Sequence, residues 1–210
     1  LLRRPVKFVA DRLESFVSDI HARDHRVEAK LAIRPDGRIA ALAVEDLTGI
    51  GPYSMYPRSS CVEGNQVINL IGAPYVVPAY RAHLKVVFQN KNCMSQYRAV
   101  GHPIAMAVME GLMDEAAAAC GLDPAELRRR NLIADDAYPV TSPAGMKFTE
   151  LSHHRCLEKL LELMDYEGLR SERDELRAKG IHRGIGIASM VEITNPSPLF
   201  YGVGGAPISV

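Results

Sequence analysis

The residues whose types are best suited to ligand binding lie at 97–103, in the run YRAVGHP, directly ahead of an apolar segment. Gly101 and Pro103 are typical of a turn that opens a helix, and the first N–H groups of that helix would lack intrahelical partners. Arg98 adds a full charge beside the positive end of the helix dipole. Such a turn suits an anion or an oxygen-rich ligand. A purely structural turn, in which Arg98 pairs with a carboxylate and Tyr97 packs, is the alternative.

Other polar groups give weaker signals. His21 and His25 are four residues apart, but no third ligand lies at a useful spacing, so they predict a solvated turn rather than a metal pair. Glu110 and Asp114 have the same spacing and are interpreted as solvated or bridging residues, not as an acid–base pair. The arginines at 128–130 end a predicted helix, where cations complement its dipole.

A glycine-rich run, GVGG at 202–205, has neither the lysine nor the strand–loop–helix context of a phosphate-binding loop. It follows Phe200 and Tyr201 in a proline-rich segment, and two aromatic residues in a loop suit the wall of a pocket. Ordinary packing of these aromatics explains them equally well. The residues alone therefore offer one anion-type turn and no complete catalytic set.

The composition is that of an ordinary globular protein. Of 210 residues, 47% are hydrophobic and 24% charged, and 25 basic residues balance 25 acidic ones to a formal net charge of zero. This balance favours neither nucleic acid nor an anionic membrane as partner, and no apolar run is long enough to span a bilayer. Four dispersed cysteines predict neither a zinc site nor an iron–sulfur site, and a reduced, cytoplasmic setting is expected. Both ends of the sequence are expected to be cuts through a longer polypeptide.

The elements that would position the 97–103 run come in the order strands, helices, strand, which predicts an α+β fold. Residues 5–12 resemble a strand leading into a short turn. Alternating residues at 27–33, a PDG turn at 35–37 and an apolar return at 39–44 predict a β-hairpin. Residues 80–90 predict another strand.

Helical periodicity follows from residue 102, and Gly121 suits the end of this helix. The sequence DPAE at 123–126 predicts a second helix that opens with a capping box. Residues 151–169 and 171–180 predict two more helices. Residues 182–193 predict a late strand.

The order of these blocks resembles the large, molybdenum-cofactor-binding subunit of the xanthine dehydrogenase and aldehyde oxidase family. The blocks are RRPVKFVADRLESF, the hairpin RPDGRIAAL, YRAVGHPIAMAVMEGLMDEAAAACGLDPAELRRRNLI and HRGIGIASMVE. The most specific part is the aromatic-Arg-x-x-Gly turn followed by a helix and GLDPAELRRRNLI. The resemblance covers residues 1–210, as part of the molybdopterin-binding domain of a larger subunit.

By this resemblance, Tyr97, Arg98, Ala99 and Gly101 form a turn that faces molybdenum and its pterin dithiolene. The backbone amide of Arg98 would lie near the oxygen or sulfur ligands of the metal. Ala99 replaces the first glycine that relatives usually carry, which is a small change. The apolar helix after the turn would be its rigid mount.

The resemblance also implies a substrate pocket. Val100 lies where relatives often have an aromatic residue, and Gln66 lies where purine hydroxylases carry a substrate-binding arginine, which argues against a purine. The carbon monoxide dehydrogenase branch has a copper-bridging cysteine in this turn; Ala99 and Val100 supply no thiol, which argues against that reaction. Phe200 and Tyr201 are the other expected pocket residues.

The activity implied is that of a molybdenum hydroxylase, an oxidoreductase that oxidises an aldehyde or an N-heterocycle with water as oxygen source. Electrons would pass to iron–sulfur and FAD partners, and the molybdopterin would be bound either alone or as a dinucleotide. The general-base glutamate is expected outside this chain, so the active site here is incomplete. The alternatives are a non-catalytic fragment or structural part of a split subunit, which supplies one wall of the site, and a simple anion-binding module.

Overall fold

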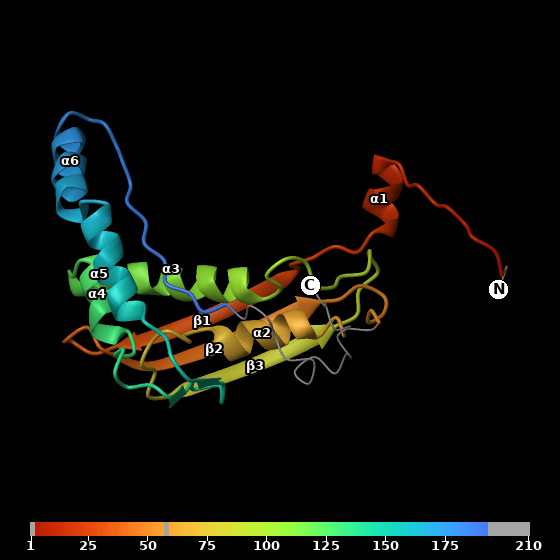
Figure 1. Ribbon diagram of the computed structural model, residues 1–210, viewed down its shortest axis with the longest axis horizontal. Helices are drawn as coiled ribbons and strands as arrows, with labels where there is room; N and C mark the ends of the chain where they lie inside the picture. Colours follow the sequence, from red (N-terminus) through yellow and green to blue (C-terminus); the bar gives the residue numbers. More distant parts are fainter. Residues whose placement is uncertain (1–2, 57–58, 193–210) are drawn as a thin grey trace, which may run out of the picture.

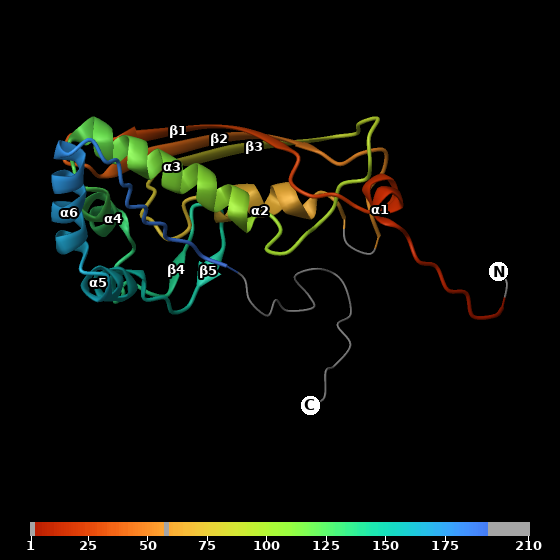
Figure 2. The ribbon, with the colours of Figure 1, turned by 90° about the horizontal axis from the view of Figure 1, so that it is seen from above.

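The chain folds around a three-stranded sheet that two helices cover on one face. The computed structural model describes residues 3–56 and 59–192. The strands are β1 (His25–Ile33), β2 (Ile39–Gly49) and β3 (Tyr80–Val87), in the order β1-β2-β3. The two covering helices, α2 (Val62–Leu70) and α3 (His102–Cys120), lie on the same side of this sheet (Figures 1 and 2). The predicted α+β class is confirmed.

The predicted hairpin is confirmed, with β1 and β2 antiparallel. Gly37 has φ +81° in the connecting turn, a conformation that glycine adopts without strain. Every second residue of β1, from Val27 to Ile33, packs against the core beneath the helices. β3 pairs with β2 in parallel, because α2 lies between the two strands in sequence and carries the chain back across the sheet.

All four helices predicted beyond residue 101 are present. After α3 come α4 (Pro124–Asn131), α5 (His153–Leu163) and α6 (Tyr166–Ala178). These three gather at the end of α3 near the β1–β2 turn (Figure 1). The short antiparallel pair β4 (Val140–Thr141) and β5 (Lys147–Phe148) lies between α4 and α5 in sequence. No helix within residues 3–56 and 59–192 combines the length and apolarity needed to cross a bilayer.

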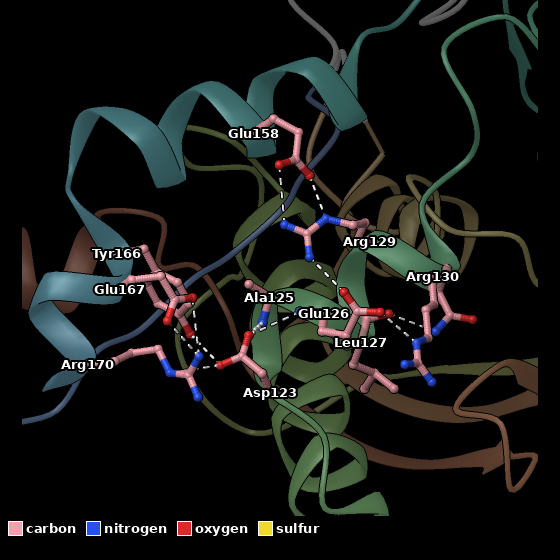
Figure 3. A network of polar contacts seen from close by, with 11 residues as sticks. Asp123, Ala125, Glu126, Leu127, Arg129, Arg130, Glu158, Tyr166, Glu167 and Arg170 are labelled. Atoms are coloured by element: carbon pink, nitrogen blue, oxygen red, sulfur yellow. Dashed lines mark hydrogen bonds and ion pairs between the residues drawn. The ribbon is translucent and has the colours of Figure 1, made fainter. Parts of the chain in front are cut away.

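Ion pairs on the surface join α4 to α5 and also connect residues within α4 (Figure 3). Arg129 Nε lies 2.6 Å from Glu158 Oε1 of α5, and Arg130 Nε lies 2.8 Å from Glu126 Oε1. Half of the predicted capping box is absent. The Glu126 carboxylate pairs with Arg129 and Arg130 instead of accepting the backbone N–H of Asp123. Asp123 alone caps α4, and accepts the N–H groups of the first turn at 2.9 and 3.1 Å.

The strand predicted at 5–12 is wrong. Residues 3–11 have no regular structure, and the segment expected as a short turn is helix α1 (Arg12–Ser18). Asp11 accepts the Glu14 N–H at 2.9 Å and Glu14 accepts the Asp11 N–H at 3.0 Å, a reciprocal capping box that starts the helix. An extended segment becomes a strand only with a ladder partner, and none of the described strands pairs with residues 3–11.

The late strand predicted at 182–193 is also absent from its described part. Residues 182–192 are irregular, and no described strand lies beside them to complete a ladder. Phe200, Tyr201 and the GVGG run at 202–205 lie outside the described residues.

Candidate functional site

The 97–101 turn has an unusual backbone conformation. The Val100 N–H donates to the Tyr97 carbonyl at 2.7 Å, and the His102 N–H donates to the Ala99 carbonyl at 3.0 Å. Ala99 has φ +67° and Val100 has φ +49°, the left-handed region that glycine favours and that a β-branched residue rarely adopts. Each such residue costs about 1–2 kcal/mol. The surrounding structure must therefore impose the conformation of this turn.

Helix α2, to which the sequence pattern assigned no element, supplies that support. Gln66 is buried, and its Oε1 accepts the Gly101 N–H at 3.1 Å. A Cβ on Gly101 would lie 2.4 Å from the Glu63 carbonyl oxygen and 2.9 Å from the Val67 nitrogen, so α3 begins in backbone contact with α2. The structure thus brings Gln66, predicted as a pocket residue, directly beneath the turn.

Two backbone donors of the turn have no acceptor. Within the described part of the chain, nothing accepts the N–H of Arg98 or that of Ala99. Two of the donors expected to be free, at the start of the helix, are instead occupied: that of Gly101 by Gln66 and that of His102 by a carbonyl. Successive free N–H groups in a turn form a concavity suited to anionic or acceptor atoms.

The alternative of a purely structural turn, in which Arg98 pairs with a carboxylate and Tyr97 packs, is not supported. The exposed Arg98 side chain makes no ion pair with any described residue. Tyr97 is 64% exposed and lies outside the core. The guanidinium of Arg23 lies 5.4 Å from the centre of the Tyr97 ring, and its Nη2 donates to the Arg98 carbonyl.

A buried charge cluster lies behind the turn and consists of His25, Asp46 and Glu63. His25 Nδ1 lies 2.9 Å from Asp46 Oδ2, and His25 Nε2 lies 3.0 Å from Glu63 Oε1. The interpretation of His25 as part of a solvated turn is therefore wrong, since its side chain is 4% exposed. The two carboxylates come from β2 and α2, which only the fold brings together. A signal for α2 existed in the apolar spacing of Val67 and Leu70.

The charge state of His25 follows from these partners. Burial alone lowers the pKa of His25, but the hydrogen bonds and charges of Asp46 and Glu63 outweigh burial and raise it to about 9. The imidazole is thus a cation at neutral pH. It offsets the two buried carboxylates, which would otherwise repel each other across the β2–α2 interface.

The stability of the protein is expected to fall as pH rises from about 6.5 towards 9. The pKa of His25 is higher in the folded state than in the unfolded state, so its contribution is complete below pH 6.5 and is lost as the pH passes the folded value. The loss is at most roughly 3 kcal/mol. Urea unfolding at pH 6 and pH 9 measures it.

His25→Gln should flatten this part of the pH profile while lowering stability at pH 6. His83→Gln, at an exposed position of β3, should leave the profile unchanged. An equal fall in stability between pH 6 and 9 in His25→Gln and wild type would show that another group causes it.

The comparisons with known proteins agree with this fold. A family profile described as "Molybdopterin cofactor-binding domain" matches residues 1–132. The chain belongs to this family of cofactor-binding domains, as the resemblance predicted.

Two of the similar proteins are named as a large subunit or large chain, and a third as an oxidoreductase. The nicotine 6-hydroxylase large subunit of Paenarthrobacter nicotinovorans is 32% identical, over 93% of this chain and 24% of its own length. The carbon monoxide dehydrogenase large chain of Hydrogenophaga pseudoflava is 28% identical, over 94% and 25%. Quinoline 2-oxidoreductase from Pseudomonas putida 86 matches in structure with a TM-score of 0.75 and 34% identity, over 82% of this chain and 22% of that one. This chain spans about a quarter of the length of the curated relatives it matches.

Proposed function

We propose that this chain forms one wall of the cofactor site of a molybdenum hydroxylase, with Tyr97, Arg98, Ala99 and Gly101 facing the molybdopterin. The observation that carries the proposal is the pair of N–H groups, on Arg98 and Ala99, that have no acceptor in the described chain. Oxygen and sulfur ligands of a metal are acceptors, and the exposed positive charge of Arg98 complements the anionic groups of the pterin. The residues present therefore fit the group.

In this proposal, the described side chains hold the 97–101 turn in place and do not ligate the metal. Among the described residues, no group of three His, Cys, Asp or Glu side chains is arranged to hold a metal ion, so contact through backbone amides is the role assigned to the turn. When bound, the molybdenum cofactor would supply oxidation of a substrate carbon with water as oxygen source. Glu63, whose backbone lies close to Gly101, is already paired with His25, so we assign the general base to residues outside this chain.

The substrate class proposed is an aldehyde or an N-heterocycle. Two similar proteins are named for nicotine and quinoline, both nitrogen heterocycles, which supports the second class. Val100 and Gln66 are the described residues proposed for the pocket, with Phe200 and Tyr201 as further candidates. The absence of a thiol at Ala99 and Val100 supports a reaction other than carbon monoxide oxidation.

The proposed partners are the remainder of a large subunit and the iron–sulfur and FAD components that would receive the electrons, in a cytoplasmic complex. The cofactor proposed is molybdenum–molybdopterin, either alone or as a dinucleotide. The N-terminal arm supports a covering partner: large apolar side chains along it are mostly solvent-exposed, among them Val6, Phe8, Val9 and Leu13. Contiguous exposed apolar residues mark surfaces that another chain or segment covers.

Elemental analysis tests the proposal. The native complex is isolated by affinity purification of this polypeptide, and about one molybdenum atom per chain is expected. Arg98→Glu should lower the molybdenum content, because it places a negative charge beside the anionic cofactor at roughly constant size, and like charges repel. The matched control is Arg34→Glu, an exposed arginine in the hairpin turn at the opposite end of α3 (Figure 1). Wild-type content in Arg98→Glu would remove the turn from the cofactor site.

A split subunit, in which this polypeptide only supplies a wall, is the second candidate, and it is favoured by the lack of a catalytic acid in the described turn. Purification of the native complex distinguishes the two. If this sequence continues in one polypeptide of the length of its relatives, the chain is part of an enzyme subunit. If a separate polypeptide carries the rest, the subunit is split. Phosphate binding without any molybdenum in the complex would instead favour a simple anion-binding module.

A further inference from the structure

We propose that Arg23 is a positioning residue that holds the 97–101 turn in the conformation that presents its two free amides. The inference rests on the proposed function, because it assigns a role to those amides. Arg23 is 75 residues from Arg98 in sequence and lies at the start of the segment that leads into β1. No sequence pattern connects the two positions.

The first step is the anchor of Arg23. Its backbone N–H donates to Glu63 Oε1 at 2.8 Å, and the same oxygen contacts His25 Nε2 at 3.0 Å. Glu63 is 4% exposed, and His25 is bound on its other side to Asp46. The backbone of Arg23 is therefore tied to a buried, charge-balanced cluster. Hydrogen bonds to a charged acceptor are about twice as strong as neutral ones.

The second step is the contact of Arg23 with the turn. Its Nη2 donates to the carbonyl of Arg98, and its guanidinium lies over the ring of Tyr97. One side chain thus contacts two consecutive residues of the turn. Arg23 itself has φ +65°, an unfavourable conformation for a residue with a side chain. The Glu63 bond to its N–H helps to hold that conformation.

The third step follows from peptide geometry. The carbonyl of Arg98 and the N–H of Ala99 belong to one peptide unit, and among the described residues the one cis bond is Tyr138–Pro139. In a planar trans peptide, C=O and N–H point in opposite directions. A guanidinium that holds the Arg98 carbonyl therefore turns the Ala99 N–H away from itself. Ala99 has a positive φ, so this peptide would rotate more readily to a favourable conformation if Arg23 released it.

Gln66 provides a second, independent support. It holds the N–H of Gly101 from beneath, whereas Arg23 holds the other side of the turn. Loss of Arg23 should therefore leave the start of α3 in place and change only the peptide ahead of it. The side chain of Arg23 is exposed, so its removal leaves no buried charge unpaired.

The test compares Arg23→Gln, Arg23→Lys and the matched control Arg26→Gln in the native complex. Arg26 is an exposed arginine of β1 whose one ion pair in the described chain is with Glu28 at 2.7 Å. Three quantities are measured: the unfolding temperature, the molybdenum retained per chain after dialysis, and the molybdenum-edge X-ray absorption spectrum. Hydrogen exchange of the Val100 amide, which is bonded to the Tyr97 carbonyl, reports the turn itself.

In Arg23→Gln we expect an unfolding temperature within a few degrees of wild type, since surface substitutions rarely exceed 0.5 kcal/mol. We expect roughly ten-fold weaker retention of molybdenum, the scale typical of residues that orient a metal site, and an altered absorption spectrum in the fraction retained. Exchange of the Val100 amide should be faster, while that of Gly101, held by Gln66, should stay unchanged. Arg23→Lys restores a donor to the Arg98 carbonyl and should recover part of each effect, and Arg26→Gln should match wild type.

Wild-type exchange of the Val100 amide in Arg23→Gln would overturn the inference, and so would wild-type molybdenum retention with an unchanged spectrum. Failure of the proposed function looks different. In that case the wild-type complex itself contains no molybdenum, whereas faster exchange in Arg23→Gln would still show that Arg23 holds the turn.

Discussion

Replacing Arg128 with methionine is expected to lower the free energy of unfolding by about 3–5 kcal/mol, the cost of removing one partner from a buried ion pair. For a chain of this size, that corresponds to a fall of roughly 10 °C in unfolding temperature. Thermal and urea unfolding of the purified protein measure the effect.

The reason lies in what Arg128 contacts. Its side chain is completely buried, and it binds Glu110 Oε2 at 2.8 Å and Asp114 Oδ1 at 2.9 Å. Tyr75 donates its hydroxyl to Glu110 Oε1 at 2.6 Å, so both oxygens of this carboxylate depend on protein donors. Burial and the negative charge of Glu110 also raise the pKa of Tyr75, which stays protonated as a donor. Without the guanidinium, Glu110 would be a buried charge with one neutral partner.

Two further variants separate this cause from a general loss of packing. Arg129→Met removes the neighbouring arginine, which is partly exposed and pairs at the surface, and should cost no more than about 1 kcal/mol. Arg128→Met combined with Glu110→Gln should recover part of the loss, because the buried charge is then gone. If the loss of stability in the double variant equals the sum of the losses in Arg128→Met and Glu110→Gln measured separately, the buried ion pair does not cause the loss.

Replacing Gly101 with alanine is expected to disturb both stability and the site. The added Cβ would lie 2.4 Å from the Glu63 carbonyl oxygen, 2.8 Å from Gln66 Cβ and 2.9 Å from the Val67 nitrogen. These are mostly backbone atoms of α2, which cannot rotate away, so α2 and α3 must separate. Overpacking of this kind costs about 1–3 kcal/mol. The displacement also breaks the Gly101–Gln66 bond that holds the turn, so the proposed molybdenum content should fall.

Backbone strain does not contribute to this expected loss. Gly101 has φ −81°, which any residue adopts, so the effect is purely one of crowding. Gly111→Ala is the matched control: it lies in the same helix, is exposed, and has nothing within 4 Å of its added Cβ. That substitution should stabilise the helix by about 0.5–1 kcal/mol. An equal response of the two variants in unfolding temperature and metal content would contradict the proposed contact between α2 and the turn.

The two substitutions act on different parts of the molecule. Arg128 of α4 binds Glu110 and Asp114 in the middle and second half of α3, whereas Gly101 seats the beginning of α3 on α2. Arg128→Met should therefore lower stability with little effect on the 97–101 turn at temperatures where the protein remains folded. Gly101→Ala should lower the molybdenum content as well as the stability, because it displaces the turn directly.

Local sequence signals were sufficient for the elements whose causes are local. The hairpin follows from alternation and from a turn that needs Gly37, and α3 follows from helical periodicity between Pro103 and Gly121. Asp123 and Pro124 determine the start of α4 in the same way. The family resemblance was also visible in the 97–101 turn and in the order of the blocks. Capping, turn formation and periodicity act within a few residues, so one chain segment contains all the information.

The tertiary structure alone decided which polar residues are buried and which donors are free. Nothing near His25 in sequence shows that Asp46 and Glu63 enclose it, and nothing near Glu110 shows that it lies under Arg128. The segments at 5–12 and 182–192 have strand-like sequences but no ladder partner in the described structure. Among the described residues, nothing accepts the N–H groups of Arg98 and Ala99, whereas Gln66 of α2 accepts that of Gly101. Burial, pairing and hydrogen-bond satisfaction depend on contacts between distant segments, and a local pattern does not contain them.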